Sequence, residues 1–500
     1  MLTDSWVDDE YYVGSDGAML KNAWIKTTPD EDISDPDEDG DHWYYFDSKG
    51  KKVTDDSKKI NGRTYYFDED GEMQYGWYVD PDNDDSVYYL GEEDEGWRAE
   101  SQWLWLERPG SFADDDDNQA DAADALGCVD DSDDMCDDEG WYYFGSNGKL
   151  YKDADKKKVN GKYYYFNEHG QMLYEWINDM KVAAPGSNSN AMLDGNAATP
   201  GIAQVDHMLY TNVVEDGSRA DGWYEIDGSE DTETDGDTDW YFFDDGEAEK
   251  ADMKDDIANG LTDGGEPVYR ARIKVDSAKG KKYFCFNEYG QMQTGLQYIP
   301  DDDAFYYFDD NGYVQTGKVS DVECEDDDYD FYFDTSNGKN GRGVDGEKSN
   351  YLYFKGKKLA ADDDYRLFYW DGGIYLVNNK GKIQGSNKKY DVENDGISQD
   401  DVYVAFNSND TVKYINLDGE KETDDETIYA QELLNKALAI DEKTEGGTTI
   451  KPVDGEYSDE WVTIPSIELL DNVYTYSFST SAESDGTVNV DMKAINPQWF

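Results

Sequence analysis

The sequence is poor in several residue types on which common functions depend. Its 500 residues include four cysteines, three histidines and eleven prolines, and 44 lysines and arginines stand against 116 aspartates and glutamates, a formal net charge of −72. Nucleic acids are held by clustered basic side chains, so this charge excludes ordinary nucleic-acid binding, and it disfavours anionic membrane surfaces for the same reason. No stretch approaches the roughly 18 apolar residues of a membrane helix, which excludes membrane insertion.

The motifs of common enzymes are also missing. There is no GxSxG, HExxH or GxxxxGK[ST] motif, and the histidines are scattered over positions 42, 169 and 207. Carboxylates are so abundant that a close pair carries no information about glycoside hydrolysis. We therefore expect a protein that is not an enzyme and has no organic cofactor. A hydrolase that uses its C-terminal 115 residues for catalysis is the alternative.

The cysteines leave the redox compartment open. Cys128, Cys136, Cys285 and Cys324 fit neither a zinc site nor a CxxC redox motif. A disulfide between Cys128 and Cys136 would suit an oxidising, extracellular location, and four free thiols are an equal alternative. The N-terminus shows no signal peptide, so the chain is either cytoplasmic or exported by a signal outside this sequence.

Aromatic residues, in contrast, are abundant at 15% of the sequence. Acidic disordered chains lack aromatic residues, so we expect a folded protein despite a mean hydropathy of −0.92. The apolar residues come in bursts of three to five, which favours many small cores over one large core.

The aromatic residues recur with a period of about 21 residues. Two aromatic residues followed by phenylalanine mark the repeats at 44–46, 65–67, 142–144, 164–166, 241–243, 306–308 and 331–333. Four residues after the closing phenylalanine comes a glycine, at Gly50, Gly71, Gly148, Gly170, Gly290 and Gly312. This order is typical of a strand, a tight turn and a second strand. Because a lone hairpin is marginal in water, we predict an all-β solenoid of stacked β-hairpins with insertions and a small C-terminal α+β or β cap.

Three segments carry a family resemblance: GRTYYFDEDGEMQYGW (62–77), GKYYYFNEHGQMLYEW (161–176) and FYYFDDNGYVQTG (305–317). They resemble the cell-wall-binding repeats of Gram-positive surface proteins, a group that includes choline-binding repeats, the glucan-binding repeats of streptococcal glucosyltransferases and the repetitive ends of clostridial toxins. The resemblance covers roughly residues 5 to 385. It implies a hairpin solenoid, and its ligand could be choline, a glucan or none.

The resemblance also implies ligand sites between consecutive hairpins. In choline-binding relatives the tryptophan that follows one hairpin and the aromatic rings of the next strand hold a quaternary ammonium by cation–π attraction. Carried over to this sequence, these ligand-binding positions are Trp24, Trp43, Tyr45, Trp77, Tyr89 and Trp176. The same rings can stack on sugars, and most aromatic rings are expected to form only the core.

One acidic loop resembles a calcium site. Asp35, Asp37, Asp39 and Asp41 follow the D-x-D-x-D pattern of a calcium loop, but Phe46 stands where the bidentate glutamate is expected. A weak Ca²⁺ site and a solvated loop are the alternatives.

The departures from the period divide the chain into expected segments. Hairpin repeats are expected at 1–95, 141–177 and 223–385, an Asp-rich insertion with two cysteines at 96–140, an insertion or linker at 178–222, and a cap or small α+β domain at 386–500. Within the last segment the pattern predicts a helix over 427–440 and strands at 402–406, 412–417, 461–464 and 473–478.

These observations favour a non-catalytic bacterial protein of the cell wall or cell surface. Its aromatic grooves would bind a wall polymer, either choline-bearing teichoic acid or glucan. The alternative is an extracellular structural or adhesion stalk without a small ligand, stabilised by calcium.

Overall fold

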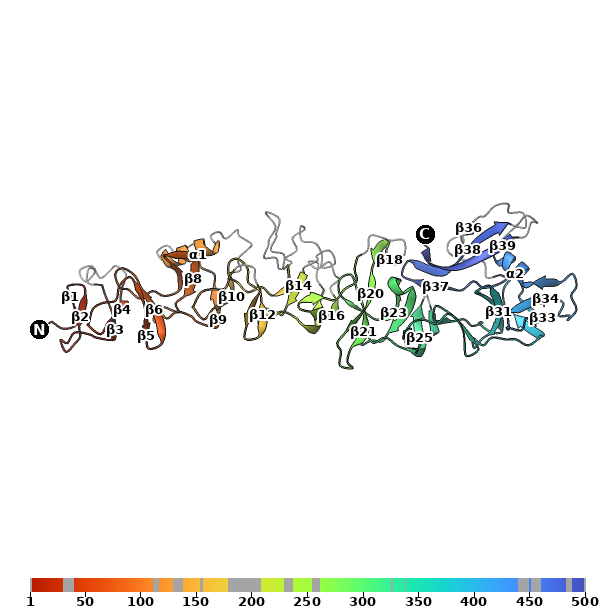
Figure 1. Ribbon diagram of the computed structural model, residues 1–500, viewed down its shortest axis with the longest axis horizontal. Helices are drawn as coiled ribbons and strands as arrows, with labels where there is room; N and C mark the ends of the chain where they lie inside the picture. The colour runs from red at the N-terminus through yellow and green to blue at the C-terminus, as the bar shows by residue number, and fades with distance from the viewer. Residues whose placement is uncertain are drawn as a thin grey trace. The chain divides into compact units, whose positions relative to one another are not determined.

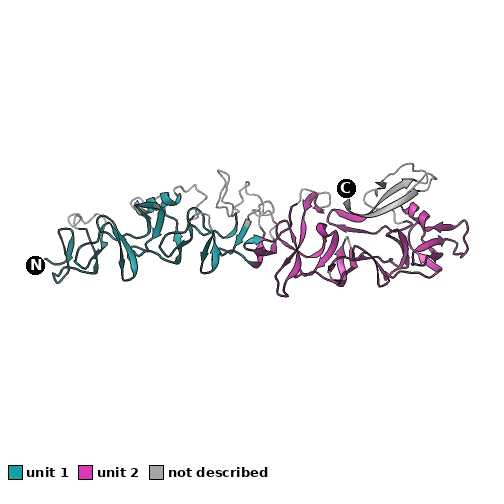
Figure 2. Cartoon of the chain, in the orientation of Figure 1, with its two compact units in different colours: residues 1–199, 207–221, 245–247 teal, residues 200–206, 222–244, 248–500 magenta. Residues whose placement is uncertain are grey.

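The computed structural model describes residues 2–29, 40–110, 117–128, 138–152, 156–178, 208–228, 237–253, 261–324, 327–336, 338–438, 449–450, 460–482 and 488–498. The chain forms two compact units (Figure 2). Unit 1 comprises residues 1–199, 207–221 and 245–247, and unit 2 comprises residues 200–206, 222–244 and 248–500. Among the described residues, no helix is long and apolar enough to cross a membrane.

The fold is built from short strands (Figure 1). Up to residue 211 the elements are β1 (Ser5–Val7), β2 (Tyr11–Val13), β3 (Ala23–Thr27), β4 (His42–Phe46), β5 (Asp56–Ile60), β6 (Arg63–Phe67), β7 (Trp77–Asp80), β8 (Asn83–Tyr89), β9 (Gln102–Glu107), α1 (Asp117–Leu126), β10 (Glu139–Phe144), β11 (Lys157–Val159), β12 (Lys162–Tyr164), β13 (Glu175–Asn178) and β14 (Met208–Thr211).

The elements after residue 222 are again mostly short strands, and the two longest are the last two, β38 and β39, with 11 residues each. They are β15 (Gly222–Asp227), β16 (Thr238–Asp244), β17 (Glu247–Ala248), β18 (Leu261–Asp263), β19 (Glu266–Val268), β20 (Arg270–Val275), β21 (Lys282–Asn287), β22 (Met292–Gln293), β23 (Gly295–Ile299), η4 (Pro300–Asp302), β24 (Ala304–Phe308), β25 (Gly317–Cys324), β26 (Asp327–Phe333), β27 (Gly346–Lys348), β28 (Tyr351–Phe354), β29 (Lys357–Lys358), β30 (Tyr365–Trp370), β31 (Gly373–Asn378), β32 (Lys388–Val392), β33 (Gln399–Phe406), β34 (Val412–Asn416), β35 (Thr427–Tyr429), α2 (Ala430–Ala437), β36 (Thr449–Ile450), β37 (Ser466–Leu469), β38 (Asn472–Ala482) and β39 (Val488–Gln498).

The hairpin solenoid is confirmed. The expected order within each hairpin, with the aromatic strand first and its partner strand after the glycine turn, is wrong. In each hairpin the aromatic strand is the second strand: β4 pairs with the preceding β3, so that Trp24 lies opposite Tyr45. The tight turn at the glycine exists, but the segment after it returns to the aromatic strand through a single bridge, as between Phe67 and Met73.

A backbone hydrogen bond to the preceding hairpin explains why this segment stays short. The N–H of Met73 donates to the carbonyl of Trp43, which belongs to the preceding hairpin, at 2.9 Å. The same link recurs from Lys52 to Glu10, Arg98 to Thr64, Leu150 to Val87, Met172 to Trp141, Arg219 to Tyr163 and Gly343 to Phe305. An amide used between hairpins cannot extend a ladder within its own hairpin.

Turn glycines fix the distance between consecutive hairpins. From the second hairpin onward, each turn glycine packs on one residue of the preceding hairpin. That residue stands two positions after the preceding hairpin's own turn glycine, and we call it the knob residue. The turn glycines have positive φ and are Gly17, Gly50, Gly71, Gly96, Gly148, Gly170, Gly217, Gly246, Gly290, Gly312, Gly341, Gly356 and Gly381. The knob residues beneath Gly50 and each later turn glycine are, in order, Met19, Lys52, Met73, Arg98, Leu150, Met172, Arg219, Ala248, Met292, Val314, Gly343 and Lys358.

Several small cores lie along the hairpins, as the composition indicates. One contains Tyr45, Phe67 and Met73, and another contains Tyr143 and Phe166. In unit 2, however, a single large core extends from Leu261 to Tyr476 in sequence. The segment expected as a cap at 386–500 therefore shares its core with the last repeats.

Two segments expected as insertions contribute strands to hairpins. Within 96–140, β9 pairs with β10, and α1 is inserted between these two strands. Within 178–222, β14 pairs with β13. Because their partner strands lie far away in the sequence, the local period does not reveal these hairpins.

The C-terminal part of unit 2 is mixed sheet and helix. Strands β30 to β35 form one sheet in the order β31-β30-β32-β33-β34-β35, in which β30 and β32 are parallel. The expected helix is present as α2 but begins only after β35, and the strand expected at 461–464 is reduced to one bridge between Phe368 and Thr463.

Cysteine usage differs between the units. Cys128 of unit 1 is disulfide-bonded, whereas Cys285 and Cys324 of unit 2 are buried thiols. Cys136, the expected partner of Cys128, lies outside the described residues.

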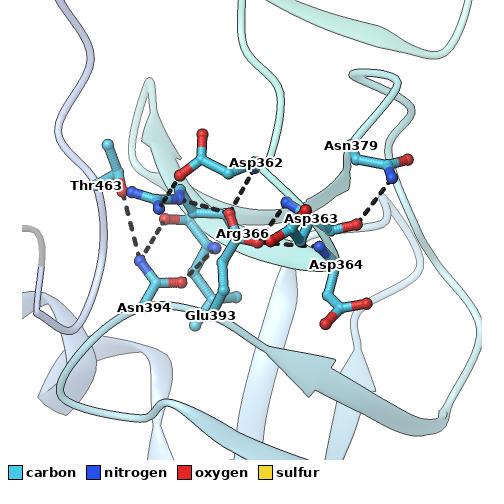
Figure 3. A network of polar contacts seen from close by, with 9 residues as sticks. Asp362, Asp363, Asp364, Arg366, Asn379, Glu393, Asn394 and Thr463 are labelled. Carbon is cyan, nitrogen blue, oxygen red and sulfur yellow. Dashed lines mark hydrogen bonds and ion pairs between the residues drawn. The ribbon is translucent and has the colours of Figure 1, made fainter.

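A carboxylate anchors the loop before β30 (Figure 3). Glu393 accepts hydrogen bonds from the backbone N–H groups of Asp362, Asp363 and Asp364 at 2.7–3.0 Å and from Nε of Arg366 at 2.9 Å. Burial alone would raise the pKa of Glu393, but these four donors hold it at about 2.

The turn glycine can be tested by comparing Gly71→Ala with Gly62→Ala. Both glycines have positive φ, so both substitutions strain the backbone by about 1 kcal/mol. A Cβ at Gly71 would also lie 2.8 Å from Cγ of Lys52 and 2.9 Å from the carbonyl oxygen of Val53, whereas nothing lies within 4 Å at Gly62. We expect Gly71→Ala to cost about 1–3 kcal/mol more than Gly62→Ala, measured by chemical unfolding of the full chain. Equal losses would contradict the packing role.

Glu393→Gln tests the anchored loop. The folded-state pKa of about 2 lies below the ordinary value of 4.5, so ionised Glu393 stabilises unit 2 above about pH 5, and this contribution disappears as the pH falls toward 2. We expect the variant to lose about 2–3 kcal/mol of unfolding free energy at pH 7 and almost nothing near pH 2. Glu422→Gln, at an exposed position, is the control, and a loss that did not depend on pH would refute the assignment.

Candidate functional site

Three places between consecutive hairpins share one arrangement of aromatic rings and a methionine. We call them cages A, B and C. Cage A consists of Trp24, Trp43, Tyr45, Tyr65, Phe67 and Met73. Cage B consists of Trp103, Trp141, Tyr143, Tyr164, Phe166 and Met172. Cage C consists of Trp223, Trp240, Phe242, Phe284, Phe286 and Met292.

One tryptophan on the first strand of a hairpin organises each cage. In cage A, Trp24 lies with its ring centroid 5.0 Å from Tyr45 on its own hairpin, and 4.9 Å and 5.7 Å from Tyr65 and Phe67 on the next. The same distances around Trp103 in cage B are 5.0, 4.8 and 5.6 Å. Around Trp223 in cage C they are 5.3, 4.6 and 5.9 Å.

Cages B and C open into pockets. The pocket of cage B has a volume of about 230 Å³ and is lined by Trp103, Trp141, Tyr164, Met172 and residues 214–216. The pocket of cage C has a volume of about 330 Å³. Both lie below or at the lower end of the range of about 300–1,000 Å³ for drug-sized ligands, so they suit a small head group.

A carboxylate stands two positions before the next turn glycine at each cage. Glu215 lines cage B and Asp310 lines cage C. At cage A, the carboxylate of Asp94 accepts a hydrogen bond from Nε1 of Trp43 at 2.9 Å. Aromatic faces beside a carboxylate form an environment that attracts a cation.

The charges at these rims are partly neutralised by lysines. Lys26 lies 2.9 Å from both Glu93 and Asp94, and hydrogen bonds from Trp43 and Lys26 lower the pKa of Asp94. At cage B, burial alone would raise the pKa of Asp216, but hydrogen bonds from Lys162 and Ser218 lower it.

Cage C differs from the other two at its rim. Tyr313 lines the pocket with its ring 5.2 Å from Phe284, and the ammonium of Lys279 lies 4.0 Å from the centre of the Tyr313 ring. Tyr313 is not one of the six members of cage C, so the exposed Lys279 lies at the rim, and the pocket of the cage remains.

The structure brings three of the sequence-predicted residues together. Trp24, Trp43 and Tyr45 are all in cage A, with 6.4 Å between the two tryptophan rings. Each of the two tryptophans is half-buried, so part of its ring remains open to solvent.

Of the other predicted residues, Tyr89 is half-buried, whereas the two tryptophans Trp77 and Trp176 occupy closed positions. Trp77 contacts Tyr89 at 5.6 Å, but it is 3% exposed because α1 packs over β7, and its Nε1 donates to the carbonyl of Glu107. Trp176 packs on Tyr210 at 5.0 Å and is 7% exposed. Neither tryptophan presents an open ring face.

Most of the expected calcium loop falls outside the described residues, namely Asp35, Asp37 and Asp39. Asp41 is described, and its carboxylate accepts a hydrogen bond from the hydroxyl of Thr28 at 2.9 Å. The described part of the chain contains no cluster of three or more metal-ligating side chains.

Sequence reasoning missed cages B and C, although a short signal marks all three cages. A tryptophan stands three residues before the closing phenylalanine in Trp43-Tyr44-Tyr45-Phe46, Trp141-Tyr142-Tyr143-Phe144 and Trp240-Tyr241-Phe242-Phe243. The missed members are Tyr65, Phe67 and Met73 of cage A and all the members of cages B and C, among them Trp103, Trp141, Trp223 and Trp240.

Comparisons with known proteins agree with this architecture. Two families described as choline-binding repeat match residues 1–28 and 56–103, respectively, and the family described as putative cell wall binding repeat matches residues 38–52, 136–150, 157–172 and 294–314. The matches include residues of cages A and B.

Individual relatives are more distant. Glucosyltransferase-S of Streptococcus mutans is 29% identical over 181 residues, which cover 31% of this chain and 10% of that enzyme. Among solved structures, CbpJ of Streptococcus pneumoniae is 17% identical, with 72% of this chain and all of that chain covered and a TM-score of 0.32. The modular autolysin LytC of the same organism is 18% identical, with 69% and 52% covered and a TM-score of 0.28. This chain thus spans only a tenth of the glucosyltransferase.

The hairpin repeats of this chain thus match family models of choline-binding and cell-wall-binding repeats over part of its length.

Proposed function

We propose that this protein is a non-catalytic binding protein of the cell surface, and that cages A, B and C hold the choline groups of a cell-wall polymer. The observation that carries the proposal is the recurrence of one ring geometry, within a few tenths of an ångström, at three separate steps of the chain. A carboxylate also lies at the rim of each of the three.

Charge favours choline over a neutral sugar as the group held in the cage. A quaternary ammonium gains from ring faces by about 0.5–2 kcal/mol per site and from the rim carboxylate as well. A glucan would use the same rings for stacking and could donate hydroxyl hydrogen bonds to Glu215 or Asp310, but as a neutral ligand it would not gain the attraction between opposite charges. The net charge of −72 acts in the same direction, since it attracts cationic ligands.

An extracellular location fits the chemistry of Cys128. Disulfides persist in oxidising compartments, and Cys128 is disulfide-bonded. The alternative, a stalk without a ligand, would leave the pockets of cages B and C without a role.

Trp103→Leu tests the cage. Leucine preserves apolar packing against Phe166 but removes the ring that faces the pocket, so choline binding at cage B should weaken by about 2- to 30-fold, the equivalent of 0.5–2 kcal/mol. Quenching of tryptophan fluorescence by choline chloride measures this, with thermal unfolding to verify the fold. Trp97→Leu, whose ring lies under Arg63 at 3.7 Å and outside the cages, is the matched control. Identical titrations of Trp103→Leu and the wild type would contradict the proposal.

Glu215→Gln separates choline from glucan as the ligand. Loss of one negative charge at the rim should weaken choline binding by about fivefold at low salt, and the difference should shrink in 1 M NaCl because salt screens it. Binding of an α-glucan oligosaccharide should change less than twofold and independently of salt, because the glutamine amide still accepts a hydrogen bond from a sugar hydroxyl. Glu69→Gln is the control, since Glu69 is exposed and also stands two positions before a turn glycine. Equal effects on both ligands would argue against a cation in the cage.

A further inference from the structure

We call the contact between two consecutive hairpins a step of the solenoid. The first step repeats the ring arrangement of cage A but contains a lysine. Trp6 takes the position of Trp24, with its ring centroid 5.4 Å from Tyr12 on its own hairpin, and 4.8 Å and 5.8 Å from Tyr44 and Phe46 on the next. All four rings are buried. We call this group the Trp6 cage.

Lys52 occupies the knob position of the Trp6 cage, where cages A, B and C have methionine. The stem of its side chain lies beneath Gly71, as Met73 lies beneath Gly96. The ammonium lies 5.1 Å from the centre of the Trp6 ring and 5.6 Å from that of Tyr44. Its Nζ is 3.0 Å from Oδ1 of Asp9, and the side chain is only 7% exposed.

This environment is the one that the proposed ligand would need. A buried ammonium is costly unless charge and dipoles compensate for the lost water. Here two ring faces and one carboxylate provide that compensation, which are the same elements that surround the pockets of cages B and C. The Trp6 cage therefore holds a cation, and the cation belongs to the chain.

Two further steps follow the same principle with arginine. The guanidinium of Arg98, also a knob residue, lies 5.4 Å from the ring of Tyr88, and its Nη1 donates to the hydroxyl of Tyr66 at 2.8 Å. In unit 2, Arg272 of β20 pairs with Cys285 of β21. Trp24 pairs with Tyr45 in the same way, so Arg272 takes the position that the tryptophan has in cage A. Its guanidinium lies 4.7 Å from Tyr306.

We propose that Lys52 is a built-in occupant that closes the Trp6 cage to external quaternary ammonium ligands. Arg98 and Arg272 close their own steps in the same way, so the chain's cations decide which steps of the solenoid bind choline. The Lys52 step immediately precedes cage A, and the Arg98 step follows it. This inference rests on the proposed function for the nature of the ligand.

Lys52→Met tests the inference, because methionine is the residue at this position in all three open cages. The full chain is labelled with ¹⁵N-tryptophan, and the indole N–H signals of Trp6, Trp24, Trp103 and Trp223 are assigned from single Trp→Phe variants. During titration with choline chloride, we expect the Trp6 signal to stay constant in the wild type. In Lys52→Met it should shift and saturate, with a Kd within about tenfold of that at Trp24.

Lys52→Arg is the matched control, since it keeps a cation in the cage, and its Trp6 signal should stay constant. If Lys52→Met disturbs the first hairpin, seen as a loss of Trp6 signal dispersion, Lys52→Leu replaces it, after Leu150 at the equivalent position.

The four signals separate this inference from the proposed function. A Trp6 signal that shifts with choline in the wild type would overturn the inference, as would one that stays constant in Lys52→Met while Trp24 responds. If Trp24, Trp103 and Trp223 stay constant but Trp6 of Lys52→Met responds, the proposed function fails and the closed cage stands. If no signal responds in any variant, both are refuted.

Discussion

The structure depends on the close approach of each turn glycine to the knob residue of the preceding hairpin. A Cβ at Gly96 would lie 2.2 Å from Sδ of Met73, and one at Gly217 would lie 2.3 Å from Sδ of Met172. Together with the amide link from Met73 to Trp43, this contact fixes both the distance and the register between hairpins. Each aromatic strand therefore packs against the aromatic strand of the preceding hairpin in the same way. This is why cages A, B and C have nearly the same geometry.

Because the steps are geometrically equivalent, a few side chains decide what each one does. A methionine knob with a tryptophan on the first strand leaves a cage with a half-open ring, as at Trp103. A lysine or arginine places a cation of the chain on the rings, as Lys52 does. At Trp77 the helix α1 covers the position. The same backbone can thus carry open, self-filled and covered steps, and differences in binding among such repeats need no change of fold.

Local regularities of the sequence revealed the period, the hairpins, the turn glycines and the grouping of Trp24 with Trp43 and Tyr45. What the sequence could not reveal depends on contacts between distant residues. Trp103 belongs with Trp141, 38 residues later, because α1 is inserted between their strands. The cover on Trp77 comes from that same helix. The direction of the hairpin was misjudged because the amide after each glycine bonds to the preceding unit, a partner about 30 residues away in the case of Met73 and Trp43.

The large negative charge does not by itself confer selectivity on the cages. The field of −72 charges attracts every cation, and salt screens it beyond about 8 Å at physiological ionic strength. A small, strongly hydrated ion such as Na⁺ gains little from a ring face, because it must give up its water to approach. A quaternary ammonium carries its charge on methyl groups that pack against tryptophan and methionine, so it gains from burial and cation–π attraction together. The carboxylates thus concentrate cations near the surface, and the rings select among them.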